Sequence, residues 1–511
     1  MTGPTTHREV ERKLRVHGLF EMPDLVKAGV AASTSSSPTF SMKAVYHDTT
    51  ELTLFRWGIT LRRREGGGDA GWHMKLPVAG ADGSARDEMR MPLDSGAVGS
   101  VPGALVEVVA PLLHELPLVP VVVLQTERTP TVVFDADGRE SVEVVDDVVT
   151  VTHDGRVVSV FREVEIESID PEDPQAGIMT DAISRVLLSM GAEPSSVSKA
   201  ASALGPRTAE PPDVPAVPSP GPSGLAVDAI RAVLSEHVRH LLMADIGVRR
   251  DIPDSVHQMR VASRRLRSAL ATFGPLLDEA ACSPIREELQ WLANELGAIR
   301  DTEVLMERLD DHAGALPDAD SERCRVVIDS ALGSRIAAAK SSALAALRSD
   351  RHQQLIDDLM IMAVAPPVVD RAYLSCDETL LPLVTRTWRH LERSIAAIRM
   401  DGPSEPWHAA RIKAKRARYA AEAVAPVFGK KLQRLSRSLA EVTEVLGDHQ
   451  DAHIAKTTLR ELALLPDTSG SAGLSLGLLY AFESDVELDD RLRFSEVWSD
   501  ARHRARTAEI T

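Results

Sequence analysis

Charged side chains recur at every second position in several short segments of the N-terminal half. In REVERKLRV, Glu9, Glu11 and Lys13 alternate with other residues, and FREVEIES repeats the pattern with glutamates. Alternate residues of a β-strand lie on one face of a sheet, so each segment carries a row of charge if it is a strand. The acidic positions are Glu9, Glu11, Glu163, Glu165 and Glu167, and the basic positions are Lys13, Arg62, Arg64, Lys75, Arg86 and Arg128.

These charged rows admit two interpretations. They can form the solvated outer face of a sandwich, because antiparallel sheets commonly expose one face to water. Adjacent like charges, however, destabilise a sheet that offers no counter-charge. The alternative is a barrel that holds acidic and basic rows inside while Val10, Val164 and Ile166 pack outward against helices. This second arrangement predicts a polar tunnel.

Acidic and basic rows facing one space specify a particular chemistry. Clustered carboxylates offer hard oxygen ligands for Mg²⁺ or Mn²⁺, and these ions bridge to phosphate oxygens. Arg binds phosphoryl oxygens in a bidentate manner, and Lys binds them as a point charge. The sequence contains no Gly-x-x-x-x-Gly-Lys phosphate loop and no Ser-His-Asp order that favours another chemistry. It therefore predicts a metal-dependent phosphate site.

The elements that must position these residues change character along the chain. Up to about residue 204, short Val- and Thr-rich segments broken by Gly, Asp and Pro predict strands and hairpins. The segment from Gly205 to Gly224 holds seven prolines, which predicts an extended, semi-rigid linker. From Leu225 onward, apolar residues at three- and four-residue spacing predict helices. We therefore expect an α+β protein divided into residues 5–204, a linker 205–224 and residues 225–511.

Composition sets the broad class. The 511 residues include 58 Lys and Arg against 75 Asp and Glu, a formal net charge of −17 that by itself argues against a polyanion partner. Binding depends on the local potential rather than on net charge, so basic patches override this argument. No apolar run reaches signal-peptide or membrane-span length, which predicts a soluble, cytoplasmic protein without a membrane partner. The three cysteines, Cys282, Cys324 and Cys376, are expected to be buried reduced thiols.

The helical half contains an internal repeat. HQMRVASRRLR at 257–267 is echoed by HAARIKAKRAR at 408–418, and each copy precedes a Leu-Gly turn ending in Asp, LGAIRD at 296–301 and LGDHQD at 446–451. On a helix, the His and basic residues of each copy share one face. A solvated face is the ordinary interpretation of such a charge run. Here the like charges repel without a counterion and the pattern is duplicated, which favours an anion-binding face.

Seven ordered motifs in the first half resemble the CYTH domain, the triphosphate tunnel metalloenzyme fold. They are Glu9-Val-Glu11-Arg-Lys13, Tyr46-His-Asp48-Thr, Leu61-Arg62-Arg-Arg64, Trp72-His-Met-Lys75, Arg86-Asp-Glu88, Glu163-Val-Glu165-Ile-Glu167 and Ser198-Lys199. The resemblance implies an eight-stranded antiparallel β tunnel with flanking helices. Members act on inorganic triphosphate, thiamine triphosphate, RNA 5′-triphosphate or, in adenylate cyclases, ATP.

The resemblance also implies roles for individual residues. The metal ligands for Mg²⁺ or Mn²⁺ would be Glu9, Glu11, Glu163, Glu165 and Glu167. The triphosphate would be bound by Lys13, Arg62, Arg64, Lys75, Arg86, Arg128 and Lys199. Catalysis would depend on Glu9, Glu11, Lys13, Arg62, Arg64 and Lys75. Asp146 or Asp147 offers a further acidic contact, with a turn residue as the alternative role.

The repeats of the second half resemble the CHAD domain, a duplicated helical-bundle module associated with polyphosphate binding. The resemblance implies two pseudo-symmetric bundles whose basic helices face a common groove. Tyr419, Glu422 and the two Leu-Gly pairs are expected to be structural. The implied polyphosphate-binding residues are His257, Arg260, Arg264, Arg265, Arg267, Arg300, His408, Arg411, Lys415, Arg416 and Arg418.

The sequence as a whole predicts an inorganic triphosphatase, a phosphoric anhydride hydrolase that forms pyrophosphate and phosphate, with a polyphosphate-binding helical domain. One alternative is a non-catalytic polyphosphate-binding or scaffold protein. Another is an adenylate cyclase or a thiamine triphosphatase with the same tunnel, for which Trp57 or Trp72 could stack on a ring. Nucleic acid is a weaker partner, because duplex binding needs a continuous basic face and base-reading side chains. The oligomeric state is left open.

Overall fold

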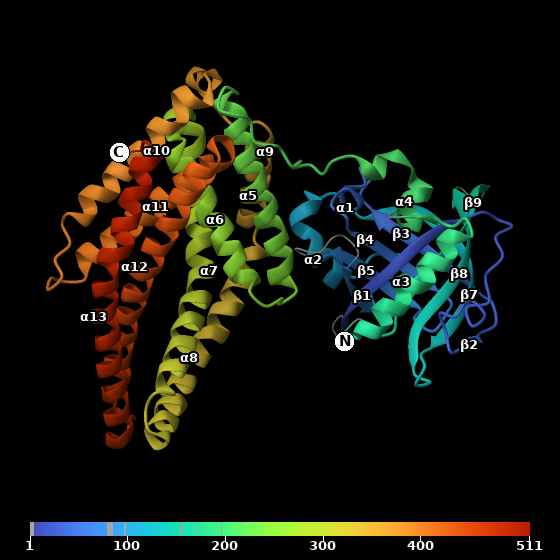
Figure 1. Cartoon of the computed structure of the whole chain (residues 1–511), viewed down its shortest axis with the longest axis horizontal. Helices are drawn as coiled ribbons and strands as arrows, with labels where there is room; N and C mark the ends of the chain where they lie inside the picture. Colours follow the sequence, from blue (N-terminus) through green and yellow to red (C-terminus); the bar gives the residue numbers. More distant parts are fainter. Residues whose placement is uncertain are drawn as a thin grey trace. The chain divides into compact units, whose positions relative to one another are not determined.

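The computed structural model describes residues 5–78, 85–96, 99–153, 156–170, 172–195 and 197–510, with the side chains of residues 5–10, 85 and 153 not described. The chain forms two compact units, Met1–Asp213 and Val214–Thr511 (Figure 1). The first unit contains the strands and the second is helical. The expected sequence of an antiparallel β region followed by an all-helical region is confirmed.

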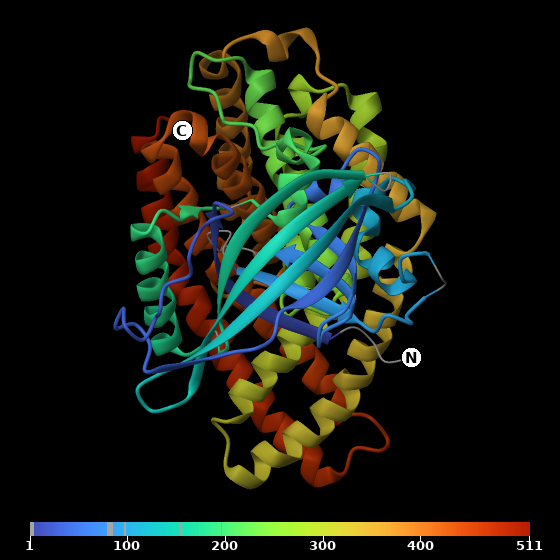
Figure 2. The same ribbon diagram turned by 90° about the vertical axis from the view of Figure 1, so that its right-hand side faces the viewer.

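The first unit contains one antiparallel sheet of ten strands, whose curvature is visible in Figure 2. Its strands are β1 (Thr5–Val16), β2 (Ser33–Ser36), β3 (Phe40–Asp48), β4 (Thr60–Glu65), β5 (Gly71–Pro77), β6 (Ala85–Met91), β7 (Val119–Phe134), β8 (Glu140–His153), β9 (Arg156–Ser168) and β10 (Glu193–Pro194). Its helices are α1 (Thr53–Arg56), α2 (Gly103–Leu113), α3 (Pro174–Ser189), α4 (Lys199–Leu204) and the 3-10 helix η1 (Pro206–Ala209).

The long strands pair in the order β1-β6-β5-β4-β3-β7-β8-β9, and β9 pairs again with β1. Residues 5–10 of β1 lie opposite β6, whereas residues 11–16 lie opposite β9. The expected count of eight strands is wrong for the whole sheet, because the short strands β2 and β10 are added to β7 and β1. β2 is an exposed run of Ser and Thr with no apolar alternation, so the pattern of the sequence gave no reason to expect a strand there.

The apolar face of the sheet packs against α3, which supports the inside-out interpretation of the charged rows. Val164 and Ile166 of β9 and Leu14 of β1 are buried in one cluster with Ile183 and Leu187 of α3. The intervening Glu163 and Glu165 are buried on the opposite face, so they are not the solvated outer face of a sandwich. The side chain of Val10 lies outside the described residues.

The charged face becomes apolar toward one end of the sheet. On β8, Asp147 is followed at alternate positions by Val149 and Val151, which pack in a second cluster with Phe55 and with Ala200 of α4. This apolar packing fills the space beyond the charged residues. The described residues therefore close the space at this end of the sheet and do not form a passage open at both ends.

The second unit consists of helices and short 3-10 turns. Its α-helices are α5 (Ala226–Arg249), α6 (Ser255–Thr272), α7 (Glu279–Ala313), α8 (Asp318–Leu347), α9 (Asp350–Val364), α10 (Cys376–Ile395), α11 (Glu405–Phe428), α12 (Lys430–Ala463) and α13 (Gly470–Thr507), with the 3-10 helices η2 (Gly274–Leu276) and η3 (Asp370–Tyr373). The two basic repeats lie on α6 and α11. The expected Leu-Gly turns are wrong: Gly297 and Gly447 lie inside α7 and α12, where flanking helix-forming residues outweigh the cost of one glycine.

The Pro-rich segment belongs partly to each unit. Arg56 pairs with Asp213 at 2.6 Å in the first unit, and Arg239 donates to the carbonyl of Val214 at 2.8 Å in the second. The three cysteines are free and buried, as expected. Within the described chain, we find no helix with the length and apolar character needed to span a membrane.

The hairpin that joins β4 and β5 gives a test of the fold. Gly66 has a φ of +84°, and a Cβ at this position would lie 2.5 Å from the carbonyl oxygen of Ser41. We expect Gly66→Ala to destabilise the hairpin by about 1–3 kcal/mol. The readout is faster hydrogen–deuterium exchange in peptides covering residues 60–77.

Gly68→Ala is the matched control, because its Cβ would meet nothing within 4 Å. Equal exchange rates in the two variants would show that the approach of Gly66 to β3 does not constrain this hairpin.

Candidate functional site

A pocket of about 380 Å³ lies on the charged face of the sheet. All eight long strands and α4 contribute side chains to it. Its lining residues are Glu11, Lys13, Tyr46, Thr60, Arg62, Arg64, Asp69, His73, Lys75, Arg90, Arg128, Val132, Glu140, Glu143, Glu165, Glu167, Ser168, Ile169, Ser198 and Lys199. The alternation of the sequence thus brings together charges from distant parts of the first unit.

Acidic and basic side chains occupy different walls of this pocket. Strands β4, β5 and β6 contribute cations, namely Arg62, Arg64, Lys75 and Arg90. Strands β8, β9 and β1 contribute carboxylates, and Glu143, Glu167 and Glu11 lie directly opposite one another across these three strands. An anion and a cation can therefore be held side by side in the same pocket.

Lys199, the first residue of α4, joins three buried carboxylates. Its Nζ lies 2.7 Å from Asp147 Oδ2, 2.8 Å from Glu165 Oε1 and 3.3 Å from Glu163 Oε1. Ser198 caps α4 by accepting a hydrogen bond from Ala201 N, which fixes the position of the lysine. Burial opposes the charged ammonium, but the three carboxylates outweigh it and raise the pKa of Lys199.

Two further cations share the carboxylate of Glu165. Arg128 donates to Glu165 Oε2 at 2.9 Å and to both oxygens of Asp147, and Lys13 Nζ lies 3.7 Å from Glu165 Oε1. Burial raises the pKa of Glu165, but Lys199, Lys13 and Arg128 together lower it well below its ordinary value. Lys13 also lies 3.0 Å from Glu11, and despite burial it lowers the pKa of that carboxyl group.

The basic wall is held by a buried glutamate and by side chains of neighbouring strands. Glu88 Oε1 lies 3.0 Å from His73 Nδ1 and 3.8 Å from Arg62 Nη2. Burial lowers the pKa of His73 to about 4, so this imidazole is neutral near pH 7. Burial, with Arg62 and Arg128 nearby, lowers the pKa of Arg64 to about 9, although Asp69 pairs with it.

The acidic wall fits a divalent cation. Both oxygens of Glu163 are buried, and Lys199 Nζ lies 3.3 Å from Oε1. Burial accordingly raises the pKa of Glu163. Glu11, Glu143 and Glu167 line the same side of the pocket and offer the oxygen ligands that Mg²⁺ and Mn²⁺ prefer.

The pocket gathers most, but not all, of the residues expected in the first unit. Arg86 does not line it and donates to the carbonyl of Gly58 at 2.6 Å, because it lies near the end of β6. Glu163 lies beneath the surface of the pocket, and Glu9 faces Arg86 in the β1–β6 register with its side chain outside the described set. The expected residues that line the pocket are Glu11, Lys13, Arg62, Arg64, Lys75, Arg128, Glu165, Glu167 and Lys199.

Several pocket residues were missed or given another role. Asp147, expected as a further acidic contact with a turn residue as the alternative, lies within β8 and is fully buried, where it pairs with Arg128 and Lys199 without lining the pocket itself. Its partner in the alternative, Asp146, faces the other way and pairs with Arg162. Tyr46, His73, Arg90, Glu140 and Glu143 also line the pocket. Counting every second residue back from Lys75 reaches His73, and counting back from Asp147 reaches Glu143. Arg90 lies opposite His73, which lies opposite Arg62, on neighbouring strands.

In the second unit, the two basic repeats bring cations from α6, α7 and α11 together. We define the basic cluster as His257, Arg260, Arg264, Arg300, Arg411 and Lys415, which are linked by their mutual electrostatic effects. Arg264 donates to the hydroxyl of Tyr419 at 2.7 Å and so connects α6 with α11. Burial, together with Arg411, Arg264 and Arg260, lowers the pKa of Lys415 to about 7.

The Gly-x-x-x-Asp segments of α7 and α12 hold equivalent arginines of the repeat. Arg260 donates to Asp301 at 2.8 Å and to the carbonyl of Gly297 at 3.3 Å. Arg411 lies 3.5 Å from Asp451, and its guanidinium passes close to Gly447. The repeated Asp and Gly therefore orient the repeated Arg.

Other expected residues of the helical unit lie outside the basic cluster. Arg265 and Arg418 both pair with Glu422, at 3.4 Å and 2.7 Å. Arg267 and Arg416 lie near each other, and burial and Arg416 lower the pKa of Arg267. His408 shares a hydrogen bond with Gln450 at 2.9 Å. Tyr419 was expected only to pack, but its contact with Arg264 gives it a positioning role.

Sequence comparison assigns both units to known domain families. The CYTH domain matches residues 7–193, and the CHAD domain matches residues 232–460. The chain is a CYTH–CHAD protein. CYTH proteins are typically divalent-metal-dependent enzymes, among them triphosphatases and cyclases.

Relatives of this CYTH–CHAD protein share its whole length. Two uncharacterized proteins of Mycobacterium tuberculosis, from strains CDC 1551 / Oshkosh and ATCC 25618 / H37Rv, are 34% and 33% identical over 94% of this chain and 94% of their own. Among solved structures, PptA from Streptomyces chartreusis is 24% identical with a TM-score of 0.47, covering 54% of this chain and all of that one. The CHAD domain from the plant Ricinus communis is 25% identical with a TM-score of 0.43, covering 53% and 92%.

Lys199 gives a direct test of the charge balance in the CYTH unit. In Lys199→Met, Asp147, Glu163 and Glu165 lose their shared cation, and we expect a loss of about 3–5 kcal/mol in the free energy of unfolding at neutral pH. In the wild type, the lowered pKa of Glu165 stabilises the fold above the ordinary carboxyl pKa, and this is lost only as pH falls through the lowered value.

In the variant, the carboxyl pKa values rise, so acidification from about pH 8 to about pH 5 should reduce the deficit. Calorimetric unfolding across this range measures it. The exposed Lys27→Met is the control. A deficit that does not change with pH would contradict an electrostatic role for Lys199.

Proposed function

We propose that this protein hydrolyses inorganic triphosphate to pyrophosphate and phosphate in the CYTH unit, with Mg²⁺ or Mn²⁺ as cofactor, and binds inorganic polyphosphate with the CHAD unit. The observation that carries the first part is the division of one pocket into a basic and an acidic wall. A metal-bound chain of phosphates is the simplest ligand that satisfies both walls. The further proposal is that the ring of paired strands encloses its substrate as a tunnel-like chamber.

The basic wall binds and orients the substrate in this proposal. Arg62, Arg64, Lys75 and Arg90 contact the phosphoryl oxygens, and Lys13 and Arg128 approach from the acidic side. These cations stabilise charge that develops on the transferred phosphoryl group and on the leaving pyrophosphate. Glu88, together with the neutral imidazole of His73, keeps the cations of the basic wall in position.

Glu11, Glu143, Glu165 and Glu167, with the expected Glu9 and Glu163, form the metal-binding side. A divalent cation held by these carboxylates would neutralise phosphate charge and would supply the Lewis acidity that favours attack by water. Glu11 is close to Lys13 and opposite Glu167, so in this proposal it lies where the metal ion meets the phosphate chain. No nucleophilic side chain is required.

The size and lining of the pocket favour an inorganic substrate over thiamine triphosphate or ATP. Its volume of about 380 Å³ lies near the lower end of the range for small-molecule sites, about 300–1,000 Å³. Trp57 and Trp72, the rings considered for stacking on a base, are both buried in the protein core. A product assay that includes cyclic AMP and thiamine diphosphate separates these alternatives.

The basic cluster supports polyphosphate binding by the CHAD unit. Its cations come from both copies of the repeat. Burial lowers the pKa of Lys415, and the neighbouring Arg411 and Arg264 lower it further because they repel another positive charge. A flexible phosphate chain satisfies such a cluster without base-reading contacts. The CHAD unit could concentrate polymer near an active enzyme, or the protein could be a scaffold without turnover. These roles differ in whether the CYTH unit hydrolyses triphosphate.

Glu11→Gln tests the hydrolase. Loss of one carboxylate from the metal-binding side should lower kcat for triphosphate by roughly 10²–10³, as expected for one preorganised electrostatic group. Phosphate release is measured with Mg²⁺ and with Mn²⁺ against triphosphate, thiamine triphosphate, ATP and long-chain polyphosphate.

The exposed Glu21→Gln is the matched control, and circular dichroism checks that both variants are folded. Wild-type turnover in Glu11→Gln would refute the assignment. An inactive wild-type protein that still binds polyphosphate would favour the scaffold.

Lys415 provides a pH test of polyphosphate binding. Its pKa is about 7, so above pH 7 the Lys415 side chain is mostly neutral in the protein without ligand. A bound polyanion favours the charged form of the side chain. Affinity should therefore increase as pH falls from about 8.5 to about 6.5. In Lys415→Met this dependence should be smaller.

Fluorescence polarisation of labelled polyphosphate measures the affinity, with the exposed Lys431→Met as control. An unchanged pH profile in Lys415→Met would contradict the assignment. DNA that displaces polyphosphate equally well at equal phosphate concentration would remove the preference for polyphosphate.

A further inference from the structure

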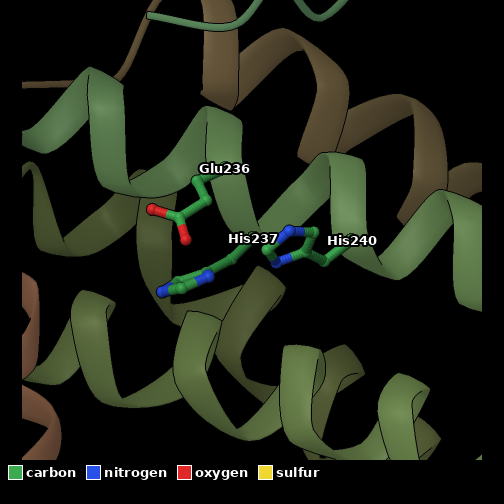
Figure 3. A group of neighbouring side chains, drawn as sticks. All are labelled: Glu236, His237 and His240. Carbon is green, nitrogen blue, oxygen red and sulfur yellow. The ribbon is translucent and has the colours of Figure 1, made fainter. Parts of the chain in front are cut away.

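A separate group of potential metal ligands lies on α5 of the helical unit. Glu236, His237 and His240 each offer a ligand atom, and these atoms all lie within 4.8 Å of one another. Figure 3 shows the three side chains together on this helix. Within the described residues, no other group of three or more His, Cys, Asp or Glu meets this distance.

The spacing of the three residues follows from the helix. Glu236 and His240 are four positions apart and His237 and His240 are three apart, so both pairs meet on the helix surface. Helix α5 is itself well fixed, because many of its residues are buried in the bundle. The ligands therefore stand on a rigid element, as a metal site requires.

His237 supplies an independent indication of a ligand. Its Nδ1 is buried and has no hydrogen-bond partner. A bound ion is one partner that can satisfy a buried nitrogen of this kind.

A pocket of about 180 Å³ borders the group and includes both Glu236 and His237. Glu422 in its lining is paired with Arg265 and with Arg418, so Glu236 is the carboxylate of this pocket that can take a cation. The pocket also leaves space for water at a remaining coordination position.

We propose that Glu236, His237 and His240 bind a Zn²⁺ ion. Two imidazoles and one carboxylate form a donor set that suits zinc, whereas Mg²⁺ prefers oxygen ligands. Ligand atoms of a tetrahedral zinc site are about 3.5 Å apart, as follows from bonds of about 2.0–2.2 Å. The exposed Glu236 and His240 reach this spacing by changes of side-chain rotamer. The site is independent of the triphosphatase proposal.

Titration of the full-length protein with Zn²⁺ in excess Mg²⁺ tests this site. The excess magnesium occupies sites made of carboxylates alone. Calorimetry should therefore detect one zinc ion per chain, bound by the three ligands on α5. In His240→Gln and in Glu236→Gln the affinity should fall about 10–100-fold or more, because loss of even an outer-shell partner has an effect of about that size. Zinc should also raise the unfolding temperature of the wild type, and it should not do so in the double variant that combines Glu236→Gln with His240→Gln.

His503→Gln is the matched control, since His503 is an exposed helical histidine on α13. Both substituted positions are exposed, which keeps the fold intact, and circular dichroism checks it. Substitution of Co²⁺ gives a second readout, a visible absorption band that the double variant should lack. Equal zinc stoichiometry and affinity in wild type and double variant, or no stoichiometric zinc in the wild type, would overturn the proposal.

Discussion

The pairing of buried charges around Lys199 is the interaction on which the CYTH unit depends. Three carboxylates come from β8 and β9, and a single ammonium from α4 lies among them. An apolar shell formed by α3 and the outer face of the sheet excludes water from behind them. The charges are therefore costly unless they are paired, and their pairing fixes the position of α4 relative to the strands. The walls of the pocket follow from this arrangement.

Much of this arrangement could be predicted from alternation in the sequence. Glu163 and Glu165 between Val164 and Ile166 place charged and apolar side chains on opposite faces of the sheet. Repulsion between like charges in a row favoured an interior charged face with counter-charges nearby. Alternation does not show how far along a strand the pocket extends. Arg86 and Arg90 share a face of β6, yet only Arg90 lines the pocket. Asp147 resembled a turn residue because neighbouring Asp residues are common in turns, and only the register with Arg128 shows its role.

The helical unit illustrates a different limit. Duplication in the sequence indicated that two basic helices act together, and α6 and α11 are joined through Arg264 and Tyr419. The Leu-Gly pairs were interpreted as turns because glycine commonly ends helices. In the structure, both glycines lie within long helices, where Arg260 donates to the carbonyl of Gly297 and the guanidinium of Arg411 lies beside Gly447. Local sequence could not distinguish these roles, since the contacts come from another helix.

The double pairing of β1 also has a consequence for how the protein folds. The strand that is synthesised first pairs with β6 along one half and with β9 along the other. Its second partner leaves the ribosome only after most of the unit has been made. Contacts between such distant segments form slowly, because a long loop must be closed first. We therefore expect pairing of β1 with β9, and with it assembly of the acidic wall, to be a late event, before which a strand edge is unpaired.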